Sequence, residues 1–253
     1  MKEILITNDD GWGSKGILTL ARQLSVLGHV TVVAPDGPQS GKSNAISVRS
    51  PLYLHKWFDS HWGEEEWQRG VDVYTANGTP SDCVKLALDV LFAGDVSRIG
   101  LLASGINHGT NASINVIYSG TIGACFVGAE HGIPSIGFSL CDYAEDADFH
   151  YMESYLVEIV QQLLAKPIPY GTCYNVNAPV GNIQGVRWTR QCMGNWESEM
   201  EERVDEKGEK YYWLVGSFVN REPEAKDTDE YALGQGYISI QPCTIDRTAY
   251  GSL

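Results

Sequence analysis

The chain has 253 residues, of which 43% are hydrophobic, and its formal net charge at pH 7 is −14. This length and hydrophobic content are enough for one folded domain, with or without an appendage. The negative charge argues against nucleic-acid polymers as partners, because these are bound by basic surfaces, and it implies that a phosphorylated substrate would need a compensating cation.

Two adjacent carboxylates follow the first predicted strand, at residues 3–7. The strand is broken by Asn8-Asp9-Asp10-Gly11, and ligands of open α/β sheets gather at the carboxyl ends of strands. Like charges side by side need compensation, so the pair indicates a hard, oxygen-seeking metal such as Mg²⁺ or Mn²⁺. Taken alone, the same residues are also typical of a simple turn.

The next segments form a βαβ unit. Apolar residues recur at helical spacing over 17–27, and residues 29–35 form a second apolar strand. A strand, a helix and a strand of this length require a parallel pair with a right-handed crossover, so the predicted fold class is α/β. The loop that follows contains Ser40 and Gly41, and its amides and hydroxyls suit an oxyanion or a metal-bound water, although an ordinary crossover loop has the same composition.

Residues 45–76 are interpreted as a β-rich excursion that contains a solvated acidic run at 64–66. After it, a helix is predicted with Ser81 or Asp82 as its N-cap.

Residues 99–103 then form a buried parallel strand. It is predicted to end in a polar, glycine-rich segment over 104–111, where Asn107 offers either an amide oxygen to a metal or a turn cap. The adjacent His108 is a weaker candidate for a general acid; as a loop histidine it is interpreted instead as a surface hydrogen-bonding residue and left outside the site.

A helix of small residues is predicted to begin at Ser119-Gly120-Thr121 and to run to residue 131. Its free amides, its positive dipole end and two hydroxyls form an anion site, or else a plain helix cap. The remaining predicted elements are strands at 133–139, 173–177 and 185–191, an amphipathic helix at 146–165 and a protruding hairpin at 195–225. Because parallel topology brings the polar strand ends to one edge of one sheet, the clusters together favour a single site.

Targeting and redox features indicate a cytoplasmic protein without a membrane partner. The N-terminus runs directly into a strand, which leaves no room for a signal peptide, and no apolar run approaches membrane-spanning length. The six cysteines form no Cys-x-x-Cys pair and are interpreted as reduced, buried residues.

Several ordered motifs resemble those of the SurE (survival protein E) nucleotidases, metal-dependent phosphatases that act on nucleoside monophosphates. The matching segments cover nearly the whole chain: ILITNDDGWGSKGI, VVAPDGPQSGKS, NGTPSDCVKLAL, ASGINHGTNASINVIYSGTIGA, GIPSIGFSL, NVNAP and GYISIQPCTID. The resemblance implies a Rossmann-like three-layer sandwich with a mostly parallel sheet, a protruding β-hairpin and a C-terminal tail. It also implies one divalent metal ion per subunit and a homodimer or homotetramer.

Carried over residue by residue, the resemblance also implies a set of site residues. The implied metal ligands are Asp9, Asp10, Ser40 and Asn107. The implied phosphate- or substrate-binding residues are Asn8, Gly41, Asn111, Ser119, Gly120 and Thr121.

The predicted reaction is metal-assisted hydrolysis of a nucleoside monophosphate, at the 5′ and possibly the 3′ position, with Asp9 as the general base. The alternatives are a short-chain polyphosphate or general phosphomonoester phosphatase, and a non-catalytic nucleotide-binding protein. A haloacid-dehalogenase-type phosphatase would need a nucleophilic aspartate where this chain has Asn8, and asparagine cannot form the aspartyl-phosphate.

The predicted organisation has three parts: a catalytic domain at 1–194, an oligomerisation hairpin at 195–225, and a segment at 226–253 that completes the domain or crosses to a neighbour. The hairpin segment is too polar to build its own core. It nevertheless carries aromatic residues of the kind that bury at subunit contacts, namely Trp196, Tyr211, Tyr212, Trp213 and Phe218.

Overall fold

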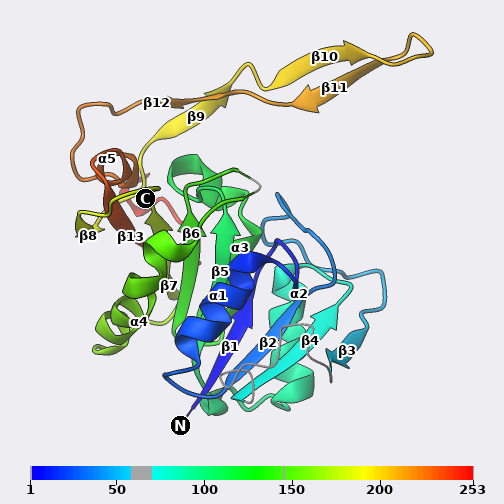
Figure 1. The fold of residues 1–253 in the computed structure, drawn as a ribbon, viewed down its shortest axis with the longest axis vertical. Coiled ribbons are helices and arrows are strands. Elements are labelled where there is room, and N and C mark those ends of the chain that lie inside the picture. Colours follow the sequence, from blue (N-terminus) through cyan, green and yellow to red (C-terminus); the bar gives the residue numbers. More distant parts are fainter. Residues whose placement is uncertain (1, 58–69, 145, 253) are drawn as a thin grey trace.

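The computed structural model describes residues 2–57, 70–144 and 146–252 (Figure 1). The predicted acidic loop at 64–66 lies outside these residues. Within them, a nine-stranded sheet has the order β3-β4-β2-β1-β5-β6-β7-β13-β8. Its strands are β1 (Glu3–Thr7), β2 (Val30–Pro35), β3 (Leu54–Trp57), β4 (Val71–Ala76), β5 (Ile99–His108), β6 (Ser135–Leu140), β7 (Thr172–Ala178), β8 (Gly185–Trp188) and β13 (Tyr237–Thr244).

Neighbouring strands from β4 through β7 are all parallel, whereas β3 and β13 are antiparallel to their neighbours β4 and β7. The buried runs of β1, β2 and β6 explain this arrangement, because a parallel sheet is covered on both faces.

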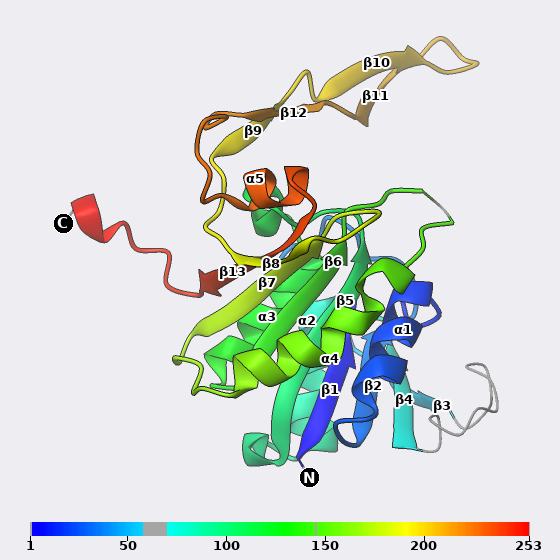
Figure 2. The ribbon, with the colours of Figure 1, turned by 60° about the vertical axis from the view of Figure 1, so that its left-hand side comes forward.

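Helices cover both faces of the sheet, which gives the three layers that the sequence predicts (Figure 2). Helices α1 (Lys15–Leu24) and α4 (His150–Leu164) lie on one face, where Ile17, Leu20 and Leu156 join the larger apolar core. Helices α2 (Pro80–Leu86) and α3 (Gly120–Glu130) lie on the other face. A single turn of π-helix, Ala87–Leu91, extends α2.

The strand order reverses at β1. From β1 the chain continues to β2 and β4 on one side, and it returns through α2 to β5 on the other side. Connections diverge at such a switch point, and ligands of open α/β sheets bind there, outside the carboxyl ends of the strands; we call this region the crevice. Asp9 and Asp10 follow β1, and Asn107 lies near the end of β5, so these predicted site residues share this crevice.

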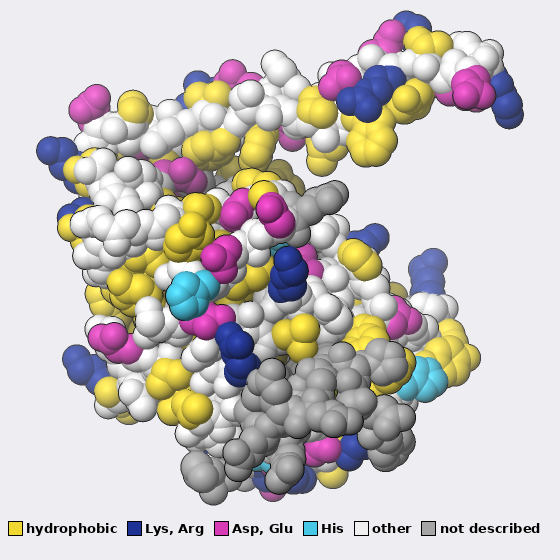
Figure 3. All heavy atoms as spheres, in the orientation of Figure 1, with side chains coloured by type: hydrophobic (Ala, Val, Ile, Leu, Met, Phe, Trp, Pro, Cys, Tyr) yellow, Lys and Arg dark blue, Asp and Glu magenta, His cyan; other side chains and the backbone are white. Residues whose placement is uncertain are grey.

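A β-hairpin arm projects from the body, as the sequence predicts. It consists of two antiparallel pairs, β9 (Gly194–Glu197) with β12 (Ser217–Asn220) and β10 (Met200–Val204) with β11 (Lys210–Leu214). The arm passes above the edge at which the parallel strands end (Figures 1 and 2). Every residue of β10 and β11 is exposed, and hydrophobic side chains are visible along the arm in Figure 3.

The C-terminal segment returns to the main sheet. After the short helix α5 (Asp229–Gly234), β13 inserts between β7 and β8, and the residues beyond it lead away from the body (Figure 2). Within the described ranges, none of the helices combines the length and apolarity needed to cross a bilayer.

Three sequence predictions about local structure are wrong. Residues 46–53 contain no strand, and β4 belongs to the central sheet instead of an excursion. The N-cap of α2 is Thr79, because Pro80 suits the first helical position and Thr79 and Asp82 form a reciprocal capping box. Strand β5 extends to His108, past its predicted end at residue 103, and its pairing with β6 has a register shift between Ser104 and Asn107.

Candidate metal and phosphate site

Asp9 is the most buried charged residue of the crevice, with 4% of its surface exposed. The Thr121 hydroxyl donates a hydrogen bond of 2.6 Å to its Oδ1 atom. Burial raises the pKa of Asp9 to about 6, and the charge of Asp10 adds to this, while the hydrogen bonds from Thr121 and the Gly120 amide oppose it. An additional positive charge beside Asp9 would therefore stabilise its ionised form.

Asp10 is held from a different element. Its Oδ2 atom accepts a hydrogen bond of 3.2 Å from the backbone amide of His108, at the end of β5. Burial also raises the pKa of Asp10, and the His108 amide opposes this shift. Asp9 is thus held by a residue of α3 and Asp10 by a residue of β5. The two adjacent carboxylates therefore contact two different elements that border the crevice.

The backbone of Gly120, at the N-terminus of α3, lies close to the side chain of Asp9. A Cβ atom on Gly120 would lie 3.0 Å from the Cβ of Asp9 and 3.1 Å from its Oδ2, so a larger residue would crowd the carboxylate. The Ser119 hydroxyl caps the helix by accepting a hydrogen bond of 3.1 Å from the amide of Ile122. This hydroxyl keeps its own hydrogen for a ligand.

The loop that carries Ser40 and Gly41 lies between Asp9 and the start of α3. The Gln39 amide donates to the carbonyl of Asp9 at 2.7 Å, and the Ser43 amide donates to the carbonyl of Tyr118 at 3.0 Å. Ser40 and Gly41 are exposed on this anchored loop. The structure therefore brings the loop to the same crevice as the carboxylates.

Asn107 lies near the end of β5, and Asn111 follows three residues after the strand ends. The Asn107 side chain donates to the carbonyl of Gly109 at 2.8 Å. Its amide oxygen can therefore accept a hydrogen bond or coordinate a cation. Asn111 is buried, and its side chain donates to the hydroxyl of Ser139 at 2.8 Å.

Two buried asparagines on β7 hold Asn111 in place, and the sequence analysis assigned them no role. Asn177 Oδ1 accepts from the amide of Asn111, and Asn175 Nδ2 donates to the carbonyl of Asn111, both at 2.8 Å. Asn175 and Asn177 also bond each other at 2.8 Å, and Asn175 reaches Gln241 on β13 at 3.2 Å. Polar residues two apart in an otherwise apolar buried strand were the signal that could have revealed this support.

Two predicted phosphate-binding side chains have other partners. The Thr121 hydroxyl hydrogen is donated to Asp9. Both amide hydrogens of Asn8 are donated at 2.9 Å, to the Gly11 carbonyl and the Ser14 hydroxyl. The buried Oδ1 of Asn8 has no hydrogen-bond partner among the described residues, and this free acceptor suits a cation or a donor better than a phosphate.

The crevice fits a hard divalent cation. Among the described residues, no group of three or more His, Cys, Asp and Glu side chains is placed to hold a metal. A cation in the crevice would therefore rely on the two carboxylates and on neutral oxygens from serine and asparagine. Such an oxygen-only set is typical of Mg²⁺ or Mn²⁺ sites, which also keep several waters.

His108 differs from its predicted position at the surface. It is half-buried at the end of β5, and its Nε2 atom is buried without a hydrogen-bond partner in the part of the chain that the structure describes. Its ring meets the edge of Phe149 at a centroid distance of 6.2 Å.

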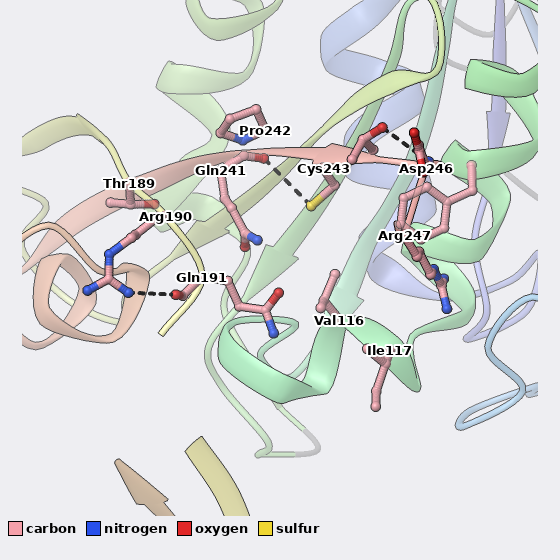
Figure 4. A pocket seen from close by; sticks show the side chains of 12 residues that line it. Val116, Ile117, Thr189, Arg190, Gln191, Gln241, Pro242, Cys243, Asp246 and Arg247 are labelled. Carbon is pink, nitrogen blue, oxygen red and sulfur yellow. Dashed lines mark hydrogen bonds between the residues drawn. The ribbon is translucent and has the colours of Figure 1, made fainter. Parts of the chain in front are cut away.

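A separate cavity of about 390 Å³ lies at β13 (Figure 4). It is lined by Val116, Thr189, Arg190, Cys243 and Arg247, among others, and by none of the predicted site residues. The Arg190 guanidinium there is engaged by Glu222 and Asp227, each at 2.9 Å. The crevice at β1 and β5 is therefore the better candidate for chemistry.

An open parallel sheet with carboxylates and a helix N-terminus at its switch point is typical of Rossmann-like α/β proteins that bind phosphorylated ligands. Residues 4–198 match the family model of survival protein SurE, and the chain belongs to this family.

Curated relatives support this assignment. A protein of Phocaeicola vulgatus named 5′-nucleotidase SurE is 45% identical over 99% of this chain and 93% of its own length. A protein of the same name from Cytophaga hutchinsonii is 43% identical over 98% of this chain and 92% of its own length. The crystal structure of the SurE protein from Aquifex aeolicus matches with a TM-score of 0.81 and 33% identity, covering 99% of this chain and 96% of that one.

Proposed function

We propose that this protein is a metal-dependent 5′-nucleotidase that hydrolyses nucleoside monophosphates to nucleoside and phosphate. The observation that carries the proposal is the buried carboxylate of Asp9 in contact with the N-terminus of α3. A phosphate at the N-terminus of α3 would be repelled by the two adjacent carboxylates. A phosphate site here therefore requires a cation between the phosphate and the carboxylates. The names of the curated relatives support the same reaction.

We assign the metal to Asp9 and Asp10, with Ser40 and Asn107 completing an oxygen shell. When bound, one divalent ion per subunit, Mg²⁺ or Mn²⁺, would polarise a phosphoryl oxygen and offset the charge of the substrate. The free acceptor of Asn8 and the absence of nitrogen or sulfur ligands from this set support an ion of this kind.

The remaining site residues are assigned to the phosphate and to proton transfer. The Ser119 hydroxyl, the positive N-terminal end of α3 near Gly120 and the second side-chain N–H of Asn111, which is not the one given to Ser139, stabilise the phosphate charge. Asp9 accepts the proton of the attacking water, because Thr121 fixes one of its oxygens and the other lies on the Gly120 side. Thr121 therefore acts through Asp9, and Gly41, whose φ is +72°, provides the left-handed backbone conformation beside Ser40.

We further propose a homo-oligomer, dimer or tetramer, and a cytoplasmic location. The exposed apolar residues of the hairpin arm support the first assignment. All six cysteines are free thiols, which suits a reducing compartment.

The function is tested by measuring phosphate release from nucleoside 5′-monophosphates before and after chelation. We expect activity to disappear with the chelator and to return with Mg²⁺ or Mn²⁺. Full activity in excess chelator would contradict the metal assignment. A panel that includes nucleoside 3′-monophosphates, short polyphosphate and p-nitrophenyl phosphate separates a nucleotidase from a general phosphatase, and binding without phosphate release would indicate a non-catalytic nucleotide-binding protein.

A further inference from the structure

Strand β6 packs along helix α3, and two close contacts mark its path. A Cβ atom on Gly128, near the end of α3, would lie 2.2 Å from the Ser135 hydroxyl at the start of β6. A Cβ atom on Gly137, two residues further along the strand, would lie 2.4 Å from Cδ1 of Ile122, near the start of α3. Side chains two residues apart in a strand share one face of the sheet. Ser139 therefore lies on the face that α3 covers, one step beyond the contact with the start of the helix.

The Ser139 hydroxyl meets the side chain of Asn111 at this position. Both residues are buried, and the side-chain nitrogen of Asn111 donates a hydrogen bond of 2.8 Å to Ser139 Oγ. A side-chain amide nitrogen carries two hydrogens, and this bond uses one of them. The last torsion of an asparagine side chain has only broad preferences, so the bond to Ser139 decides where the second N–H points.

The neighbouring strands place Ser139 between the two halves of the proposed site. In the pairing of β5 with β6, Ser139 is opposite Asn107, the proposed metal ligand. In the pairing of β6 with β7, it is opposite Asn177, which holds the backbone amide of Asn111. The side chain and the backbone of Asn111 are therefore fixed by two adjacent strands at the edge where the parallel strands end.

We propose that Ser139 is a positioning residue, which directs the second side-chain N–H of Asn111 toward a phosphate at the N-terminus of α3. The inference rests on the proposed nucleotidase function and adds to it a residue that acts through Asn111. The place of Ser139 supports this role, because it follows the residue of β6 that contacts the start of α3. Ser135 on the same strand has a purely structural bond, since its hydroxyl donates to the carbonyl of Ile133 at 2.8 Å.

Binding of inorganic phosphate tests the proposal without requiring turnover. Calorimetric titrations at saturating Mg²⁺ would compare the wild type, Ser139→Ala and Ser135→Ala. We expect Ser139→Ala to weaken phosphate binding roughly three- to ten-fold, as the loss of one neutral hydrogen bond predicts. Ser135→Ala is the matched control, because it removes a buried hydroxyl from the same face of the same strand. It should bind phosphate as the wild type does.

A double-mutant cycle shows whether Ser139 acts through Asn111. Asn111→Ala alone should weaken phosphate binding at least as much as Ser139→Ala, because it removes the donor itself. Adding Ser139→Ala to Asn111→Ala should change phosphate binding by less than about two-fold, since the side chain that Ser139 orients is then absent. Metal affinity, measured by Mn²⁺ titration, should stay close to that of wild type in each variant, because the partners that hold Asp9 and Asp10 are unchanged.

Unchanged phosphate affinity in Ser139→Ala or in Asn111→Ala would overturn the proposal. An equal loss in Ser135→Ala would do the same, as would losses from Ser139→Ala and Asn111→Ala that simply add in the double variant.

Kinetics separate this proposal from the proposed function. In Ser139→Ala, kcat/KM for a nucleoside 5′-monophosphate should fall by about the same factor as phosphate affinity. A wild type that binds phosphate but releases none from any nucleotide would overturn the proposed function instead, and the binding comparison would still decide the role of Ser139.

Discussion

Thr121 determines how the Asp9 carboxylate is presented to the crevice. Its hydroxyl is buried and donates to Oδ1 of Asp9, which fixes the orientation of the carboxylate. Residues that orient a metal ligand typically change metal affinity or activity by about ten- to a hundred-fold when they are replaced.

We therefore predict that Thr121→Val lowers kcat/KM by about ten- to a hundred-fold, because valine keeps the shape and removes the donor. Thr121→Ser retains the hydroxyl and should keep most of the activity. Steady-state kinetics at saturating metal, followed by a metal titration, would measure both variants. Wild-type kinetics in Thr121→Val would show that the hydrogen bond has no part in the reaction.

Asp9 itself is predicted to be essential for turnover but not for folding. Asp9→Asn keeps the size of the side chain and an oxygen that accepts from Thr121, but it removes the charge and the base. We expect kcat/KM to fall by several orders of magnitude while the melting temperature stays close to that of wild type.

The matched control for Asp9→Asn is Asp36→Asn, which changes an exposed carboxylate that follows β2. This variant should retain full activity. If Asp9→Asn hydrolysed nucleotides at the wild-type rate, Asp9 would have only the role of a turn residue.

At the scale of elements, strands β7 and β13 hold the segment that carries Asn111 through buried hydrogen bonds. Asn175 on β7 bonds the Asn111 carbonyl and Gln241 on β13, and it accepts from Asn177. All these groups are buried. The C-terminal strand therefore contributes to the position of Asn111, which lies more than a hundred residues earlier.

Asn175→Ala should destabilise the protein, because it leaves several buried polar groups without partners. Each unsatisfied group costs about 1–3 kcal/mol, so we expect a loss of at least about 2 kcal/mol in the free energy of unfolding. Urea denaturation would measure the loss, with the exposed Asn182→Ala as the control. Equal stability of Asn175→Ala and wild type would mean that water replaces the missing bonds.

The central elements were predictable because their periodicity is local. β1, β2 and β6 are continuous apolar runs, and α1 carries its apolar residues at helical spacing, so the sequence alone indicates parallel strands and crossover helices. The strand-end residues followed from this topology, since parallel strands end at one edge.

Features that depend on distant partners were not predictable. The insertion of β13 between β7 and β8 is set by long-range pairing, which no local pattern encodes. The hydrogen bonds that hold Asn111 and the half-buried position of His108 likewise depend on residues far away in the chain. The cap of α2 was locally encoded by Thr79-Pro80, but the competing polar residues Ser81 and Asp82 obscured it.

At the scale of the whole molecule, the hairpin arm is the part that projects from the folded body. Its root is anchored, because Trp196 donates to Asn115 at 2.8 Å and packs against Phe218 at a centroid distance of 6.1 Å. These two aromatics therefore pack within their own chain and do not serve as free anchors. The outer pair β10 and β11 has only exposed residues, including Met200, Trp213 and Leu214.

An isolated two-stranded hairpin is at best marginally stable in water, so the exposed apolar side chains of the outer pair call for a partner surface. We predict that the wild type is a homo-oligomer and that deleting 195–225 shifts its mass toward the monomer. Because the root packs on the body, a shorter deletion of 199–215 should give the same shift with less loss of stability.

Point substitutions test the same surface without removing the arm. Leu214→Glu should weaken the assembly, whereas Lys207→Glu at the tip turn should not, since Lys207 is a charged residue that is exposed to solvent. Light scattering or sedimentation across micromolar concentrations would measure all four variants, and a wild type that stays monomeric over this range would instead make the arm an intrachain lid above the crevice.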